Sequence, residues 1–327
     1  MTARRVLVTG GAGFIGSHVA EALLQRGDRV DILDNFDHFY DPAVKRRNIA
    51  GLLDHPNFGL FEGDIRDVTA LEEVFGQARH DAVIHLAARA GVRPSIADPA
   101  LYDSVNVLGT TRLLEQIRLH HVPQLVFGSS SSVYGSTTKV PFSESEPADR
   151  PSSPYAATKR ANELACYAFH ELYGTEITCL RFFTVYGPRQ RPEMAIHRFT
   201  ELIASRRTVP VFGDGRTRRD YTYIADIVAG VLAALDRPNG YRIYNLGTTT
   251  TTRLDDLVRS IGEALGMPVS VRREPLCPGD VPITFADITR AREELGYEPT
   301  TPLKAGLCSF VSWYRECNYE LAELAAG

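Results

Sequence analysis

The sequence has few cysteines, and their arrangement excludes the usual metal and disulfide frameworks. There are five cysteines, an odd number, and they are widely spaced with no C-x-x-C pair. Their positions are Cys166, Cys179, Cys277, Cys308 and Cys317. Secreted disulfide scaffolds and zinc sites need paired, closely spaced cysteines. We therefore expect no metal site, and free thiols favour a reducing compartment.

Long apolar runs and a strong charge excess are also missing. No stretch approaches the ~18 apolar residues that a membrane span needs, and the N-terminus passes from Thr2-Ala3-Arg4-Arg5 into a strand pattern without a signal-peptide core. The 36 basic residues nearly balance the 40 acidic ones, with a net charge of −4. We expect a soluble, cytoplasmic protein that binds neither membrane nor nucleic acid.

What the sequence contains is an alternation of short branched runs with helical patterns. The apolar runs are Val6-Leu7-Val8, 30–33, 82–86, 125–127 and 177–181, and the helical patterns cover 16–26, 104–120 and 155–173. Repeated β-α-β order predicts an α/β fold, a Rossmann-type doubly wound parallel sheet. The rhythm breaks after Gly187-Pro188, and sheet material returns at helix 225–236 and strand 244–246. We therefore predict two interleaved domains, 1–187 with 222–248 and, smaller, 188–221 with 249–327.

A glycine-rich turn follows the first predicted strand. Gly11-Ala12-Gly13-Phe14-Ile15-Gly16 matches G-x-G-x-x-G between a strand and a helix, the context in which backbone amides bind a pyrophosphate. Asp34 ends the second strand, where a carboxylate accepts hydrogen bonds from an adenosine ribose and repels a 2′-phosphate. This combination favours NAD over NADP. Asp64 and Ile65, after the apolar run 58–61, are candidates to hold the adenine.

Tyr155 and Lys159 are the candidate catalytic pair. Residues i and i+4 of a helix share one face, so the phenol and the ammonium can meet. A free tyrosine has a pKa of ~10, and a cation about 4 Å away contributes roughly the 4 kcal/mol needed to bring it near 7. An isolated Y-x-x-x-K is more often an ordinary surface helix, so the interpretation depends on the rest of the chain.

Five motifs occur in a fixed order. They are 9–16, His85-Leu86-Ala87-Ala88, 129–135, Tyr155-x-x-x-Lys159 and Arg181-x-x-x-Val185-Tyr186-Gly187-Pro188. With them the chain resembles, over essentially its whole length, the extended short-chain dehydrogenase/reductases, and most of all the nucleotide-sugar epimerases. The resemblance implies that Tyr155 is the acid/base, that Lys159 binds the nicotinamide ribose and lowers the pKa of the tyrosine, and that Ser130 bonds the reacting hydroxyl.

The same resemblance implies an NAD site and a homodimer. Together with the glycine turn, the expected NAD contacts are Gly10, Gly11, Gly13, Phe14, Ile15, Gly16, Asp34, Asn35, Asp64, Ile65, Leu86, Ala87, Ala88, Asn106, Tyr155 and Lys159. The helices near 104–118 and 155–173 would pair with their copies in a second subunit. The first domain then binds NAD, and the smaller one binds a UDP-sugar.

The serine run separates subgroups of this family. Nucleotide-sugar 4,6-dehydratases resemble this chain but carry Asp-Glu where Ser131 and Ser132 stand, so elimination lacks its carboxylates here. UDP-glucuronate decarboxylases carry glutamate in place of Ser132, which disfavours decarboxylation.

Three segments are similar to UDP-glucuronate 4-epimerases in particular: Tyr40-Asp41-Pro42, Ala90-Gly91-Val92-Arg93-x-Ser95, and 182–194. A sugar carboxylate needs hydroxyls and a cation, and Ser131, Ser132, Thr184 and Arg191 offer them; Arg93 is a further candidate. We therefore expect 4-epimerisation of UDP-glucuronate to UDP-galacturonate. UDP-glucose 4-epimerase and UDP-glucuronate decarboxylase remain alternatives, as does a non-enzymatic NAD-responsive binding protein.

Two residues are candidates for the nucleotide end of the substrate. Arg219 matches the arginine that grips the diphosphate in the family, and Asp280 matches the group that reads the uridine ribose. Many family members have an arginine where this chain has Cys277.

Overall fold

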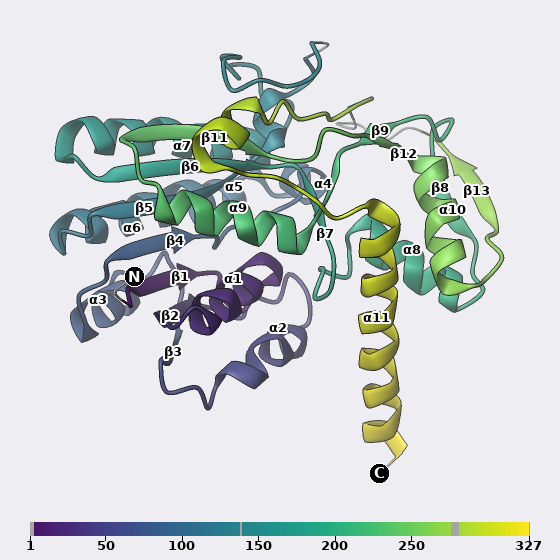
Figure 1. Ribbon diagram of the computed structural model, residues 1–327, viewed down its shortest axis with the longest axis horizontal. Coiled ribbons are helices and arrows are strands. Elements are labelled where there is room, and N and C mark those ends of the chain that lie inside the picture. The colour runs from purple at the N-terminus through teal and green to yellow at the C-terminus, as the bar shows by residue number, and fades with distance from the viewer. Residues whose placement is uncertain (1–2, 138, 276–280, 327) are drawn as a thin grey trace.

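The structure is a computed structural model that describes residues 3–137, 139–275 and 281–326. Its centre is a sheet of seven strands in the order β11-β6-β5-β4-β1-β2-β3, and every neighbouring pair is parallel (Figure 1). The strands are β1 (Arg5–Thr9), β2 (Arg29–Asp34), β3 (Phe58–Glu62), β4 (Ala82–His85), β5 (Gln124–Ser130), β6 (Glu176–Phe182) and β11 (Tyr241–Leu246).

Side chains of the sheet are buried on both faces. Along β1, Val6 and Val8 belong to one core, and Leu7 belongs to another. The alternation follows from the two-residue period of a strand, and burial on both faces explains why these segments read as continuous apolar runs.

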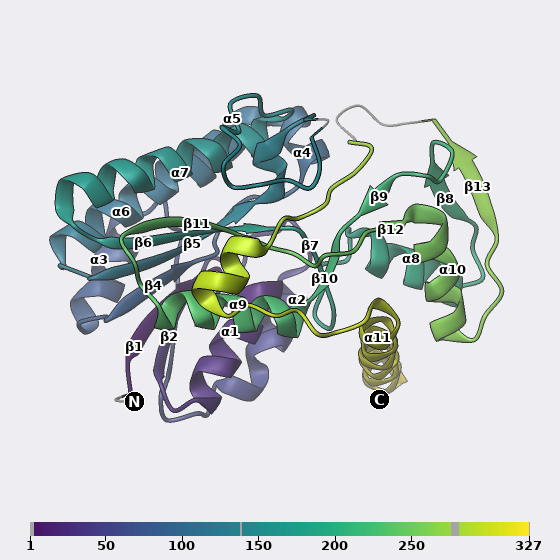
Figure 2. The same ribbon diagram turned by 45° about the horizontal axis from the view of Figure 1, so that its top comes forward.

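Helices cover both faces of the sheet. One face is covered by α1 (Phe14–Gln25), α2 (Pro42–Ile49) and α9 (Ile224–Asp236), and the other by α3 (Val68–Gln77), α6 (Gly109–Leu119) and α7 (Pro154–Tyr173) (Figures 1 and 2). This arrangement confirms the predicted doubly wound Rossmann-type fold.

The strand order reverses beside β1. The chain builds β2 and β3 on one side of β1 and then returns to place β4 on its other side. In open parallel sheets a crevice forms outside the carboxyl ends of the strands at such a reversal. The segments that follow β1 and β4 therefore face a common space.

A second group of elements lies at one end of the sheet and has its own core (Figure 2). It contains α8 (Ala195–Ala204), β8 (Val209–Phe212), β9 (Arg218–Arg219), β12 (Thr252–Arg253), α10 (Leu254–Leu265), β13 (Val271–Glu274) and α11 (Leu303–Ala326). Strand β8 pairs in parallel with β13, and β9 pairs antiparallel with β12. Strands β7 (Thr184–Tyr186) and β10 (Tyr221–Tyr223) pair in parallel where the chain enters and leaves this group.

The remaining elements are single turns or short helices: η1 (Ala50–Leu52), α4 (Val92–Ala97), α5 (Pro99–Tyr102), η2 (Asp103–Leu108), η3 (Ser131–Tyr134) and η4 (Ala291–Leu295). The sequence predicts a single regular helix over 104–120, but in the structure the first part of this segment, η2, is π-helical. The Asn106 carbonyl in this wider turn accepts a hydrogen bond from Asn162 Nδ2 (2.9 Å). Periodicity alone cannot predict such a tertiary contact.

Helix α7 begins at the position that the catalytic pair requires. The Ser153 hydroxyl accepts a hydrogen bond from the Ala156 amide (3.2 Å), and Pro154 occupies the first helical position. A serine cap followed by proline is a strong start signal, because the serine hydroxyl accepts from one unpaired amide of the first turn and proline lacks the N–H that would otherwise be unpaired. Tyr155 therefore lies in the first turn of α7 and Lys159 in the second. Among the described residues, no helix is both long and apolar enough to cross a membrane.

Candidate active site

A single pocket lies at the carboxyl ends of the central strands and collects most of the predicted site residues. Those that line it are Gly10, Gly13, Phe14, Ile15, Gly16, Asp34, Asn35, Asp64, Ile65, Leu86, Ala87, Ala88, Ser130, Ser131, Ser132, Tyr155, Lys159, Thr184 and Arg191. They come from segments up to 181 residues apart (191 − 10), and the strand reversal brings them together.

The glycine turn owes its shape to close backbone packing. A Cβ at Gly16 would lie 2.1 Å from the carbonyl oxygen of Gly10, and one at Gly11 would lie 2.4 Å from Cβ of Ile32 on β2. Helix α1 can therefore start this close to β1 only with glycine at these positions. Gly11 does not line the pocket, and its contribution is this packing against β2.

Asp34 is a buried carboxylate at the end of β2. It accepts hydrogen bonds from the amides of Ala12 (3.1 Å) and Phe36 (2.9 Å), and its Oδ1 lies 3.4 Å from the Lys45 ammonium. These contacts attach the carboxylate to the glycine turn. An ionised carboxylate has about four acceptor positions, so it keeps capacity for a further donor from the pocket.

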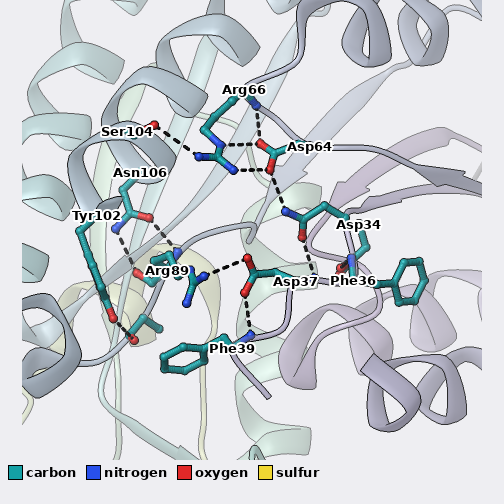
Figure 3. A network of polar contacts seen from close by, with 12 residues as sticks. Asp34, Phe36, Asp37, Phe39, Asp64, Arg66, Arg89, Tyr102, Ser104 and Asn106 are labelled. Atoms are coloured by element: carbon teal, nitrogen blue, oxygen red, sulfur yellow. Dashed lines mark hydrogen bonds and ion pairs between the residues drawn. The ribbon is translucent and has the colours of Figure 1, made fainter. Parts of the chain in front are cut away.

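Asp64 occupies the neighbouring strand end, after β3. Arg66 donates to it three times, from its amide (2.8 Å), Nε (2.9 Å) and Nη2 (2.8 Å), and Asn35 Nδ2 donates at 2.8 Å (Figure 3). Burial raises the pKa of the Asp64 carboxyl, but the bonds from Arg66 and Asn35 outweigh it and lower that pKa to about 2. The carboxylate thus braces the wall of the pocket.

Tyr155 and Ser130 both line the pocket. The Ser130 hydroxyl donates to Ser132 Oγ (3.1 Å) and accepts from the Ser132 amide (3.2 Å). The Tyr155 ring also packs edge-on against Tyr102, with centroids 6.2 Å apart. Burial raises the pKa of the phenol, whereas the Ser130 hydroxyl and the Arg191 charge lower it. The balance is a raised pKa, contrary to the depressed value expected from Lys159.

The Lys159 ammonium is held by the protein itself, and its predicted contact with a nicotinamide ribose stays a prediction. Its ammonium donates to the carbonyl of Gly128 (2.6 Å) at the end of β5 and lies over the Phe127 ring, 5.0 Å from the centroid. Burial lowers the pKa of Lys159 to about 8, and the nearby Glu163 charge opposes this. Lys159 still lines the pocket, but the charge that acts on Tyr155 in this structure is that of Arg191.

Arg191 and Thr184 line the same pocket as the serine run. The Arg191 guanidinium pairs with Glu193 (Nε to Oε1, 3.1 Å) and lies 5.8 Å from the centroid of the Phe39 ring. Burial raises the pKa of Tyr40, Tyr102 and Tyr155, and the Arg191 charge opposes this rise in all three; Tyr40 and Tyr155 line the pocket. Hydroxyls from Ser131, Ser132 and Thr184 line the same pocket.

Comparison with known proteins agrees with this geometry. The model of the family described as GDP-mannose 4,6 dehydratase matches residues 7–309. UDP-glucuronate 4-epimerase 4 of Arabidopsis thaliana is 45% identical over 327 residues, which cover 94% of this chain and 75% of the relative. The UDP-glucuronate 4-epimerase of Thermodesulfobacterium geofontis is 41% identical, with 96% and 97% covered.

A crystal structure of UDP-glucuronic acid 4-epimerase from Bacillus cereus, in complex with UDP-glucuronic acid and NAD, superposes with a TM-score of 0.90. The identity is 34%, and the match covers 96% of this chain and 99% of that one. This chain belongs to the extended short-chain dehydrogenase/reductase family. The resemblance predicted from its motifs is thereby confirmed.

Four predicted residues of this short-chain dehydrogenase/reductase do not line the pocket in the described structure. The Arg93 guanidinium lies 4.8 Å from the centroid of the Phe212 ring, and Arg219 Nη1 donates to the carbonyl of Arg218 (2.9 Å). Asn106 lies behind the wall, and Gly11 packs against β2. Asp280 lies outside the described residues. Ligand contacts from these four residues and from Asp280 stay predictions.

Asn106 supports the pocket from behind. Its Oδ1 accepts from the Arg89 amide (2.8 Å), and its Nδ2 donates to the Arg89 carbonyl (3.0 Å) (Figure 3). The same Nδ2 donates to Thr158 on α7 (3.0 Å). Asn106 therefore fixes the loop after β4 relative to the helix that carries Tyr155.

The sequence reasoning missed three charged residues around the pocket, two on loops and one on α2. Asp37, Lys45 and Arg89 all line it. Lys45 pairs with Asp34, and Arg89 pairs with Asp37. The sequence did contain a signal for Lys45. Asp41 and Pro42 mark the start of α2, and a helix that begins there places Lys45 in its first turn.

Within the described parts of the chain, no group of three or more His, Cys, Asp or Glu residues could hold a metal ion.

Proposed function

We propose that this protein is an NAD-dependent 4-epimerase that converts UDP-glucuronate to UDP-galacturonate through a 4-keto intermediate. The observation that carries the proposal is that one pocket is lined by the glycine turn, by Tyr155 with Ser130, and by Arg191 with Thr184. Relatives named UDP-glucuronate 4-epimerase at 41% and 45% identity support the same assignment.

The residues at the carboxyl ends of β1 and β2 fit NAD. The glycine turn presents backbone without side chains at the start of α1, and Asp34 presents a carboxylate that accepts from ribose hydroxyls and repels a 2′-phosphate. Leu86, Ala87 and Ala88 line the opposite wall. NAD, when bound, accepts a hydride from the substrate carbon and later returns it.

The chemistry of the chain itself is proton transfer at the sugar O4. Tyr155 as phenolate takes the O4 proton while Ser130 holds the hydroxyl by a hydrogen bond. The Arg191 guanidinium supplies positive charge that favours the phenolate, and the Lys159 ammonium would bind the nicotinamide ribose, as the family resemblance implies. After the keto sugar has turned over in the pocket, Tyr155 returns the proton to the opposite face, and the C4 configuration is inverted.

Arg191 and Thr184 would select the uronate and protect its intermediate. The 4-keto form of a uronate is a β-keto acid, which loses CO₂ when the carboxylate bond aligns with the carbonyl π system. Hydrogen bonds from Thr184, Ser131 and Ser132, with a charge-assisted bond from Arg191, would hold the carboxylate out of that alignment. Very little UDP-pentose should therefore form.

The remaining parts of the chain fit a nucleotide sugar and a symmetric partner. Residues 1–187 with 222–248 would bind NAD, and residues 188–221 with 249–327 would bind the UDP-sugar, with Arg219 at the diphosphate and Asp280 at the uridine ribose.

On α7, Leu164, Tyr167 and Leu172 are 54%, 48% and 70% exposed. This apolar face supports a homodimer through α6 and α7, which sedimentation would test. Free thiols support a cytoplasmic location.

The test compares two sugars and two arginines. Arg191→Ala should raise KM for UDP-glucuronate at least tenfold more than KM for UDP-glucose, because only the uronate carries the carboxylate that Arg191 binds. Arg189→Ala is the matched control, since Arg189 pairs with Glu21 at 2.9 Å and does not line the pocket. Equal effects of Arg191→Ala on both sugars would contradict the assignment of Arg191.

A second variant tests protection of the intermediate. Thr184→Ala should raise the ratio of UDP-pentose to UDP-galacturonate, measured by chromatography of the products. An unchanged ratio would remove Thr184 from the carboxylate site. If the wild type releases mainly UDP-pentose, or acts on UDP-glucose alone, the decarboxylase or the UDP-glucose 4-epimerase is the correct assignment.

A further inference from the structure

A buried carboxylate lies one helical turn beyond Lys159 on α7. Tyr155, Lys159 and Glu163 stand at i, i+4 and i+8 and so share one face of the helix. Glu163 is fully buried and accepts four hydrogen bonds: from Ser129 Oγ (2.6 Å), Arg181 Nε (2.9 Å), Arg181 Nη2 (2.8 Å) and Arg160 Nη1 (3.0 Å). These bonds use all acceptor positions of a carboxylate.

The partners of Glu163 lie on the strands that carry the reacting groups. Ser129 is the neighbour of Ser130 at the end of β5, and Arg181 lies near the end of β6. The guanidinium of Arg181 also lies 4.7 Å from the centroid of the Tyr134 ring, just after the serine run. The Glu163 side chain therefore connects α7, which carries Tyr155, to β5, which carries Ser130.

The charge of Glu163 also acts on Lys159. The Lys159 side chain is buried beside it, and burial lowers the pKa of its ammonium to about 8. Glu163 contributes the largest opposing charge effect, followed by Cys166 on α7 and Cys179 on β6. The other titratable groups around Lys159 are His85 on β4, whose own pKa burial and Lys159 lower to about 3, and Tyr155 and Arg160 on α7 and Arg181 on β6.

We propose that Glu163 is a positioning residue for the epimerisation, which keeps the Lys159 ammonium charged in its place and holds the β5 end that carries Ser130. The inference rests on the proposed roles of Tyr155 and Lys159. A carboxylate that only stabilised the fold would be indifferent to the protonation of Lys159. The two roles therefore differ in their pH dependence.

The kinetic test uses Glu163→Gln and the dependence of kcat on pH. The variant keeps the size of the side chain and loses its charge, so Lys159 should lose its proton at lower pH. The alkaline limb of kcat should move down by about one pH unit, with KM and bound NAD within twofold of the wild type. Glu163→Asp, which restores the charge, should return the limb toward its original place.

Arg160→Gln is the matched control. It removes one partner of Glu163, partly exposed at 23%, and leaves the carboxylate in place. The alkaline limb of Arg160→Gln should stay in place or move to higher pH, because the positive charge of Arg160 no longer offsets the effect of the Glu163 carboxylate on Lys159. A downward shift as large as that of Glu163→Gln would overturn the inference.

Glu163→Gln leaves the buried Arg181 without its carboxylate, which strongly destabilises a fold. If that variant does not fold, Glu163→Gln/Arg181→Met replaces the whole ion pair with neutral side chains. Arg181 pairs directly with Glu163, so the double variant also removes a positive charge, and its downward shift should be smaller than that of Glu163→Gln but still present. A fall in kcat that is uniform across pH would show a purely structural role.

A measurement without substrate separates this inference from the proposed function. The chain has only four lysines, Lys45, Lys139, Lys159 and Lys304, so NMR of protein labelled with 13Cε-lysine can follow the Lys159 titration, assigned by Lys159→Met. The midpoint should fall by about one unit in Glu163→Gln. An unchanged midpoint overturns the inference, whereas a wild type that fails to epimerise UDP-glucuronate overturns the proposed function alone.

Discussion

Arg89 and Asp37 join two loops across the pocket. Nη2 of Arg89 donates to Oδ2 of Asp37 at 3.0 Å, so the loop after β4 is tied to the loop after β2 (Figure 3). The backbone of Arg89 is itself clamped by Asn106, and its guanidinium lies 5.3 Å from the centroid of the Phe39 ring. The pair therefore connects the two walls between which we place NAD.

Breaking this ion pair should weaken cofactor retention. A partly buried pair contributes on the order of 1 kcal/mol, so Asp37→Asn should speed NAD release about fivefold. NAD that remains bound after gel filtration, and its exchange with labelled NAD, would be measured. Arg46→Met is the control, because the Arg46–Glu62 pair is exposed and lies outside the pocket. Equal retention in Asp37→Asn and wild type would show that the ion pair does not hold the cofactor.

Arg191 should set the acid limb of the rate. The Arg191 charge lowers the pKa of Tyr155, while burial raises it. Because the phenolate is the active form, the rate rises with pH through this pKa, and Arg191→Met should move the acid limb of kcat/KM to higher pH. That limb reports the enzyme without bound sugar, so the substrate carboxylate does not interfere. Arg189→Met should leave the limb in place, and a limb that also stays in Arg191→Met would contradict the prediction.

Asp64 should contribute to stability in a defined pH range. Its pKa is lowered from 3.8 to about 2 in the folded protein, and the shift corresponds to roughly 2 kcal/mol. Because the pKa of Asp64 is lower in the folded than in the unfolded protein, its ionised carboxylate stabilises the fold above the unfolded pKa near 4. This stabilisation disappears as the pH falls toward 2. The free energy of unfolding of Asp64→Asn should therefore lie below that of the wild type at pH 6, and the gap should close near pH 2. A gap independent of pH would count against the ion pair as its source.

The two glycines Gly16 and Gly76 should respond in opposite directions to alanine. A Cβ at Gly16 meets the Gly10 carbonyl at 2.1 Å, so Gly16→Ala should displace the turn and lower both stability and NAD affinity. Gly76 lies within α3 and has nothing within 4 Å of a Cβ, so Gly76→Ala should stabilise by up to about 1 kcal/mol through helix propensity. Thermal unfolding and NAD titration of both variants check this, and equal effects would show that close packing does not shape the turn.

Local patterns predicted the sheet, the main helices and the start of α7, because strand period, glycine turn and the Ser153 cap are properties of neighbouring residues. The family resemblance named Tyr155, Ser130, Thr184 and Arg191 as candidate site residues, and the structure places all four in the lining of one pocket. The pairing of Lys159 with Gly128, the raised pKa of Tyr155 and the Asp37–Arg89 contact were not predictable in this way. Each depends on burial or on the meeting of segments far apart in the chain.

The π-helical turn at Asn106 has the same origin. Its carbonyl and side chain bond to Asn162 and Arg89, which lie 56 residues later and 17 residues earlier. The apolar pattern of 104–120 predicts only a helix. The π-helical turn, and the way in which it braces the pocket, could be seen only in the structure.

The most direct test of the proposed epimerase follows UDP-glucuronate by proton NMR in D₂O with the purified enzyme. We predict UDP-galacturonate with protium still at C4, because the hydride returns to the carbon that it left, and very little UDP-pentose. Absence of UDP-galacturonate, a predominance of UDP-pentose, or deuterium at C4 would contradict the proposed reaction.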